Sequence, residues 1–166
     1  MGRLRRLGIG ALAALCCACA HSNYTVQRDG GARLSEFHRI GVLPLKDPKG
    51  QGDPIAQGIQ DGLQKLLFEP PDVAALKRLA VEYKLEPNSG MRLEAVETIR
   101  DQASADAIIL GVMAPDWSAA SLVIAEMEMG QPVMRVVVTP RDPKKKAFTS
   151  AGEVAQEAVR ALASLR

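Results

Sequence analysis

Ala107-Ile-Ile-Leu-Gly-Val-Met113 is a nearly continuous apolar run in this chain of 166 residues. Such a run is typical of a strand that is covered on both faces of a parallel sheet. A second run, Arg39-Ile-Gly-Val-Leu-Pro-Leu45, is bounded by the polar loop Lys46 to Asp53 and also predicts a buried strand. Because helical patterns separate the two runs, the sequence predicts βαβ construction with a parallel sheet.

Three helices are predicted between these strands. Asp53-Pro54 would supply an N-cap and a first-turn proline for the first helix, which continues to about Phe68. Asp72 would cap the second helix. The alternation over residues 80–85 would also suit a strand, although we favour the helix. The apolar face of the third helix comprises Leu93, Val96, Ile99 and Ala103.

The C-terminal part follows a different pattern. Residues 121–129 and 133–139 are strand-like runs separated by Gly130-Gln131-Pro132, which predicts a type II′ hairpin and antiparallel pairing. Ser150-Ala-Gly-Glu153 is a capping-box pattern that predicts a last helix covering the sheet. The expected fold is therefore α/β. It has a mixed sheet, with a parallel βαβ part plus a C-terminal antiparallel hairpin, flanking helices and a C-terminal helix.

The N-terminus has the order of a secretory signal. Arginines at positions 3, 5 and 6 precede an uncharged apolar stretch from Leu7 to Cys19, and a polar segment follows. This stretch is shorter than the roughly 20 residues that span a bilayer, so cleavage is expected rather than retention. Cys16-Cys17-Ala18-Cys19 resembles a bacterial lipobox, with Leu15 one position further from Cys19 than is usual. Ala18-Cys19-Ala20 also fits a cleavage site before His21.

We favour lipidation of Cys19, and a free secreted form starting at His21 is the alternative. Stable anchoring takes more than one acyl chain, which the bacterial lipoprotein modification would provide. The predicted organisation is a lipoprotein signal region over residues 1–19 with anchor Cys19, a tether over residues 20–36, and a single α/β periplasmic domain over residues 37–166.

Composition narrows the functions that this domain could have. The chain has 21 basic and 19 acidic residues, but without the signal arginines the balance is 18 against 19, or net −1. A near-neutral domain lacks the charge of a nucleic-acid-binding protein. All three cysteines lie in the signal region, so neither an internal disulfide nor a thiolate metal site is expected.

Two features could carry chemistry near the first strand. The loop Lys46 to Asp53 precedes a helix N-terminus, where backbone N–H groups can hold an anion. Gly50-x-Gly52 lacks the further residues of a nucleotide-binding motif, so a solvated turn is favoured. His38 is the only histidine besides His21, and no nucleophile motif accompanies it. No catalytic residue and no cofactor are expected.

The C-terminal half offers carboxylates and thioethers. Glu126 and Glu128, two apart in a predicted strand, should share one face, as an exposed polar edge or as paired carboxylates. Met127 and Met129 are expected to fill the core, with a partner surface or Cu(I) binding as alternatives.

The candidate functional residues also include one aromatic residue and one basic run. Trp117 is expected to be buried, and an exposed partner anchor is the alternative. Lys144-Lys145-Lys146, with Arg141, forms a basic patch that either faces water or contacts anionic lipid.

The strand 40–45, the segment 103–111, Trp117 and the paired strands ending near Thr139 together resemble a group of bacterial envelope lipoproteins. The group comprises the curli-pore lipoproteins, the penicillin-binding-protein activators and smaller related lipoproteins. The resemblance implies lipidation of Cys19 with fatty acyl chains such as palmitate, a domain related to the TolB N-terminal type, and binding or assembly without catalysis. Ala20 after Cys19 would favour the outer membrane. The chain lacks the long segments that form the curli pore, so no pore is expected.

These observations together predict a membrane-anchored periplasmic lipoprotein of the outer membrane. It would act as a non-catalytic protein-binding or scaffolding component of envelope assembly, with an envelope protein partner or self-association and no nucleic acid. A periplasmic small-ligand or metal-binding module is the alternative, and a hydrolase has the least support.

Overall fold

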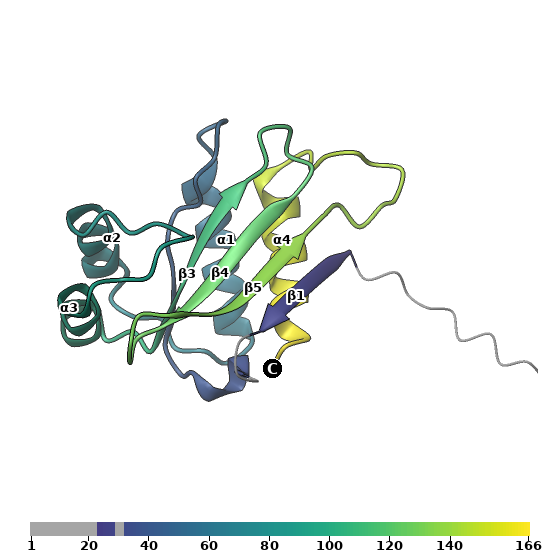
Figure 1. The fold of residues 1–166 in the computed structure, drawn as a ribbon. Helices are drawn as coiled ribbons and strands as arrows, with labels where there is room; N and C mark the ends of the chain where they lie inside the picture. Colours follow the sequence, from purple (N-terminus) through teal and green to yellow (C-terminus); the bar gives the residue numbers. More distant parts are fainter. Residues whose placement is uncertain (1–22, 29–31) are drawn as a thin grey trace, which may run out of the picture.

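A computed structural model describes residues 23–28 and 32–166, so the signal region and Cys19 lie outside the described residues. The chain forms a five-stranded sheet with helices on both faces (Figure 1). The elements in chain order are β1 (Tyr24–Arg28), the short 3-10 helix η1 (Leu34–Glu36), β2 (Ile40–Val42), α1 (Gly52–Lys65), α2 (Val73–Glu82), α3 (Leu93–Ala103), β3 (Ala107–Met113), β4 (Ala120–Glu126), β5 (Pro132–Val138) and α4 (Ala151–Ala163).

The sheet is mixed, as predicted. Its strand order is β1-β5-β4-β3-β2. The pair β2–β3 is parallel, whereas β3–β4, β4–β5 and β5–β1 are antiparallel. The expected βαβ part, C-terminal hairpin and C-terminal helix are all confirmed. For the ambiguous segment 80–85, the choice of helix is confirmed for residues 80–82, because α2 continues to Glu82, whereas residues 83–85 form the turn that follows the helix.

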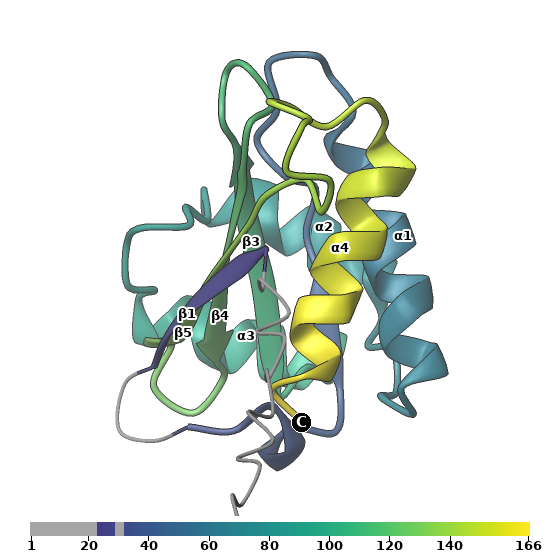
Figure 2. The ribbon, with the colours of Figure 1, turned by 90° about the vertical axis from the view of Figure 1, so that its right-hand side faces the viewer.

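The helices form a layer on each face, and the two layers differ in extent. α1 and α4 lie side by side across one face (Figure 2), and their apolar residues join the larger core cluster. α2 and α3 cover only the β2–β3 side of the other face, around Leu43, Ile108 and Leu110. The face of β5 and β1 on that second side carries no helix among the described residues. Thr25 and Gln27 are exposed there, and Val137 is half-buried.

Two glycines of α1 allow close contact with α4. A Cβ on Gly58 would lie 2.7 Å from the Cβ of Ala155, and one on Gly62 would lie 2.2 Å from Cγ2 of Val159. Real side-chain atoms do not approach this closely, so the two helices could not pack at this separation with larger residues.

The side chain of Gln60 on α1 completes the outer edge of β2. It is 4% exposed. Its Oε1 accepts a hydrogen bond from the backbone N–H of Val42 at 3.0 Å, and its Nε2 donates to the backbone oxygen of Ile40 at 3.0 Å. One amide therefore satisfies two backbone groups that a neighbouring strand would otherwise pair.

The predicted tether has to be shortened. Residues 24–28 form β1, which pairs with β5 in the register Tyr24↔Val138 to Arg28↔Met134. Tyr24 and Val26 pack against the larger core, while Thr25 and Gln27 point outward. Residues 34–36 of the same range form η1, and Leu34 is fully buried. The chain joins the fold earlier than residue 37 because this short alternation buries apolar side chains.

The predicted type II′ hairpin is wrong. β4 ends at Glu126 and β5 begins at Pro132, so the connection is a loop from Met127 to Gln131. The carboxylate of Glu126 closes this loop by accepting hydrogen bonds from the backbone N–H groups of Met129 and Gln131 at 2.9 and 3.1 Å. The longer loop forms because a carboxylate satisfies its backbone donors.

Two helix predictions also need correction. α1 begins at Gly52 with Gln51 at the N-cap position, so Asp53 lies inside the first turn and is not the cap. The carboxylate of Asp47 instead accepts a hydrogen bond from the N–H of Gln51 at 2.6 Å. Leu93 at the start of α3 is 58% exposed, because it precedes the part of the helix that contacts the core.

Candidate functional site

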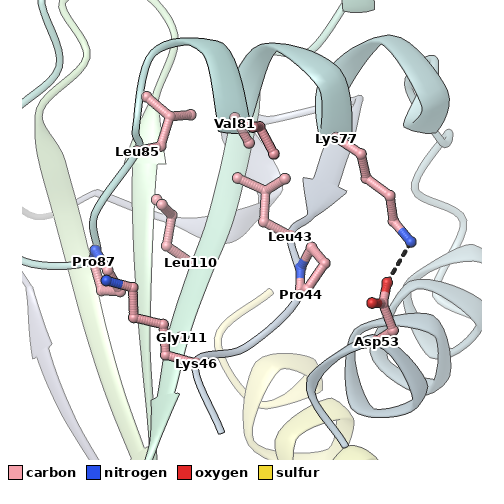
Figure 3. A pocket seen from close by; sticks show the side chains of 11 residues that line it. Leu43, Pro44, Lys46, Asp53, Lys77, Val81, Leu85, Pro87, Leu110 and Gly111 are labelled. Carbon is pink, nitrogen blue, oxygen red and sulfur yellow. Dashed lines mark hydrogen bonds and ion pairs between the residues drawn. The ribbon is translucent and has the colours of Figure 1, made fainter. Parts of the chain in front are cut away.

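An apolar cavity of about 370 Å³ lies between α2 and the segment that follows β2 (Figure 3). A volume of this size falls within the range of roughly 300–1,000 Å³ found for small-molecule sites. The residues that line it are Leu43, Pro44, Lys46, Asp53, Lys77, Ala80, Val81, Leu85, Pro87, Leu110 and Gly111.

The parallel strands position the floor of the cavity. After β2 the chain stays beside β3, because the N–H of Leu43 donates to Ile109 and the N–H of Lys46 donates to Gly111. Alternation along this segment turns Leu43 toward α2 and Leu45 toward the α1–α4 side. The floor is therefore made of strand-end leucines and backbone.

The C-terminal part of α2 forms the wall of the cavity. Leu76 and Leu79 hold this helix on the sheet, and both are buried. Gly41 in β2 permits the contact, since a Cβ there would lie 2.3 Å from Cδ2 of Leu76. Val81 lies on the opposite side of the helix from those leucines and is 79% exposed at the cavity. An exposed valine beside a cavity is apolar surface that a ligand or a protein side chain could cover.

Two ion pairs lie at the cavity, and both are largely exposed. Lys77 Nζ lies 2.5 Å from Asp53 Oδ1 (Figure 3), and Lys46 pairs with Glu86. Exposed pairs contribute about 0–1 kcal/mol, so an anionic group of a ligand could replace either carboxylate at small cost. The arrangement suits a molecule with an apolar body and one anionic group. It places no nucleophile beside a general base, as acyl or phosphoryl transfer would need.

The loop predicted over Lys46 to Asp53, as either an anion site or a solvated turn, ends at Gln51 because α1 begins at Gly52, and its own carboxylate closes it. Asp47 Oδ1 accepts a hydrogen bond from the indole Nε1 of Trp117 at 2.7 Å. Burial raises the pKa of Asp47, but hydrogen bonds from the backbone of Gln51 and Lys49 and from Trp117 outweigh burial and lower it. A carboxylate thus occupies the position where an external anion would bind.

Trp117 is buried, as expected, at 3% exposure. Its backbone has a φ of 62°, which is uncommon for a residue other than glycine. Lys49 Nζ lies 4.1 Å from the centroid of its ring. Packing in the larger core, the bond to Asp47 and this cation–π contact hold the residue in place.

The predicted residues near β4 are separated by the structure. Met127 is 2% exposed and fills the smaller core, whereas Met129 is 62% exposed. The two thioethers therefore do not share a face, and neither do Glu126 and Glu128, because the strand ends at Glu126. Within residues 23–28 and 32–166 no cluster of three or more His, Cys, Asp or Glu side chains could hold a metal ion.

His38 and the lysine run lie at the surface. The backbone N–H of His38 donates to Asp106 Oδ2 at 3.0 Å. Lys145 pairs with Glu153 at 2.9 Å, whereas Arg141, Lys144 and Lys146 are exposed and make no ion pair among the described residues. Backbone and side-chain hydrogen bonds from Thr149 and the contact with Lys145 lower the pKa of Glu153 to about 2.

No helix within the described part of the chain is long and apolar enough to span a bilayer. No protein-family model matches the chain, and no curated protein sequence does. Two solved structures of PelC from Paraburkholderia phytofirmans are similar in fold, and both are dodecamers. One, of a single-substitution variant, has a TM-score of 0.51 at 12% identity and covers 86% of this chain and 99% of that chain. The other has a TM-score of 0.48 at 12% identity, covering 86% and 94%.

Proposed function

We propose that this chain is a lipid-anchored, non-catalytic component of the bacterial envelope that works by protein assembly, and first of all by self-association. Anchoring follows from the signal pattern and from Cys19 at its end. Membership of the curli-pore and penicillin-binding-protein-activator group stays a prediction from sequence.

The observation that carries the assembly proposal is the incompletely covered sheet. β1 is an edge strand, and no other described segment pairs with its outer side. The adjoining face of β5 and β1 has no helix over it, and it presents Val137 between Ser121 and Thr25. Open edges and open faces are the surfaces on which sheets pair and pack. The PelC fold, which spans nearly the whole of this domain, is found as a dodecamer in the structure with a TM-score of 0.51.

Light scattering on the native acylated protein in mild detergent tests self-association. We expect a species larger than the monomer, and we expect Val137→Lys to dissociate it. Lysine at this half-buried position can extend into solvent in a monomer but would place a charge inside an interface. Gln64→Lys, on the exposed side of α1, is the matched control and should leave the assembly unchanged. A native protein that is monomeric over the whole concentration range contradicts the proposal.

Anchoring has its own measurement. Intact mass and membrane fractionation of the native protein, beside Cys19→Ser, should give an acylated wild-type chain that sediments with membranes and a variant that does not. A mature chain that begins at His21 and stays in the soluble fraction contradicts anchoring and leaves a diffusible binding protein.

The cavity beside α2 favours a second function, the binding of a small amphipathic anion. A ligand that binds only the folded state raises thermal stability, by about 2.7 kcal/mol when its concentration is 100 times its Kd. We would use a medium-chain fatty acid as the probe and compare wild type with Leu110→Asn, which makes the cavity floor polar. An unchanged melting temperature in wild type removes this function.

A further inference from the structure

One end of the molecule brings together four segments that are far apart in sequence. The loop 114–119 joins β3 to β4 there, and the loop 46–51 lies beside it (Figure 1). The loop 139–150 follows β5 at the same end, since Val138 pairs with Ala120. β1 begins there too. The N–H of Thr139 donates to the oxygen of Asn23 at 2.8 Å, and Nδ2 of Asn23 donates to the oxygen of Thr139 at 2.6 Å.

This end carries a positive charge that the rest of the domain lacks. The three loops hold six basic and three acidic side chains, a formal charge of +3, in a mature chain of net −1. Residues 141–146 are all exposed. Lys145 forms an ion pair with Glu153, and Lys46 forms one with Glu86. The carboxylate of Asp47 is turned inward, where it accepts a hydrogen bond from Trp117. Arg141, Lys144 and Lys146 are therefore the cations of the loop 139–150 that remain available to another charge.

The number of residues before β1 limits how far this end can stand from a lipid on Cys19. Three residues separate Cys19 from Asn23. At roughly 3.3–3.6 Å per residue, the distance from Cys19 to Asn23 cannot exceed about 14 Å. This reach is close to the Debye length of about 10 Å at 0.1 M ionic strength, the range over which charged headgroups attract cations.

We infer that the loop 139–150 docks on anionic phospholipid headgroups of the membrane that holds the anchor, through Arg141, Lys144 and Lys146. The inference rests on the proposed function, because it requires acylation of Cys19. Docking gives the anchored domain a fixed orientation. The three loops face the membrane, while η1 and the loop between β4 and β5, at the opposite end of the strands, face away from it.

Trp117 makes this orientation measurable. It is the only tryptophan in the chain, and its backbone oxygen accepts a hydrogen bond from Phe148 of the basic loop at 2.9 Å. The native acylated protein is bound to vesicles that contain dansyl-labelled headgroups, either in phosphatidylcholine alone or with phosphatidylglycerol added. Energy transfer from Trp117 should be higher on the anionic vesicles. The difference should vanish in 1 M salt, where the Debye length is about 3 Å.

A charge-removed variant identifies the loop as the cause. Each cation near an anionic surface shifts the ratio of docked to undocked domain about fivefold, so Arg141→Gln/Lys144→Gln/Lys146→Gln should lower it about a hundredfold. Lys145 is kept because it holds Glu153. The control Lys65→Gln/Lys84→Gln/Arg92→Gln removes the same charge from exposed positions outside the three loops and should behave as wild type. An unchanged melting temperature verifies that each variant folds.

The outcomes separate this inference from the function on which it rests. Docking by the loop is overturned if energy transfer from Trp117 is equal on neutral and anionic vesicles. It is also overturned if the transfer falls equally in both triple variants. Either result leaves anchoring intact. A wild-type protein that fails to sediment with phosphatidylcholine vesicles overturns the anchor, and docking with it.

Discussion

Replacing Gln60 by leucine tests whether one side chain from α1 completes the edge of β2. The substitution keeps the volume nearly constant, but it leaves the N–H of Val42 and the oxygen of Ile40 without a partner in a buried site. Each unpaired backbone group costs about 1–3 kcal/mol, so the two together should lower the free energy of unfolding of Gln60→Leu by about 2–6 kcal/mol. Gln57→Leu, one turn earlier on the exposed side of α1, should change it by less than about 0.5 kcal/mol.

Gln60→Glu adds a pH signature to this prediction. An ionised glutamate could still accept from Val42, but its second oxygen would face the oxygen of Ile40, and burial also disfavours the charge. The folded-state pKa of this glutamate should therefore rise above its unfolded value of about 4.3. Its contribution to stability is fully present below about pH 4.3 and is lost as the pH rises through the raised folded value.

Urea unfolding followed by Trp117 fluorescence measures both variants. The loss in free energy of unfolding relative to wild type is measured at pH 5 and at pH 7.5. It should be smaller at pH 5 for Gln60→Glu and independent of pH for Gln60→Leu. A Gln60→Leu protein within about 0.5 kcal/mol of wild type at an unchanged m-value would refute the reasoning.

Three further predictions concern the helices and Trp117. Because the pKa of Glu153 is lowered to about 2 from 4.5, its stabilisation is present above about pH 4.5 and is lost as the pH falls toward 2. Glu153→Gln should cost about 1–2 kcal/mol at pH 7 in chemical denaturation, discounted from the full shift for solvent screening, and roughly a quarter of that at pH 2.5, just above the folded pKa. Gly62→Ala should cost about 1–3 kcal/mol by pushing Val159 away, and adding Val159→Ala should recover part of this cost. Gly152→Ala, where the added Cβ would meet only Ser150 Oγ at 3.9 Å, should cost nothing. Trp117→Phe removes the donor to Asp47 and should lower the melting temperature by a few degrees, with a rise in the pKa of Asp47 that NMR titration can detect.

The parts of the fold that the sequence predicted are those with strong local patterns. Residues 107–113 are apolar throughout and form β3, and Ser150 caps α4 with its hydroxyl accepting from the N–H of Glu153 at 3.2 Å. Each of these signals lies within the element itself, so no knowledge of a partner is needed to detect it.

The missed features depend on partners that are distant in sequence. β1 has only five residues, and its pattern becomes a strand because β5 lies beside it. Glu126 and Gln60 also act through partners that the local pattern does not reveal. The Glu126 carboxylate accepts hydrogen bonds from the loop that follows β4, and the Gln60 side chain bonds to β2, although the sequence shows it only as a polar residue on a helix. The cavity was missed because its lining comes from β2, α2 and β3, and only the exposed Val81 hints at it in the helical pattern.

The position of β1 also has a consequence for the order in which the chain folds. β1 precedes every other described element in the sequence, yet Asn23, just before it, bonds to Thr139, a residue 116 positions later. Pairs this distant make folding slow, because the chain must close a long loop before the contact forms. β1 must therefore remain unpaired until β5 has emerged. The first strand of the described fold to be synthesised is therefore one of the last to join the sheet.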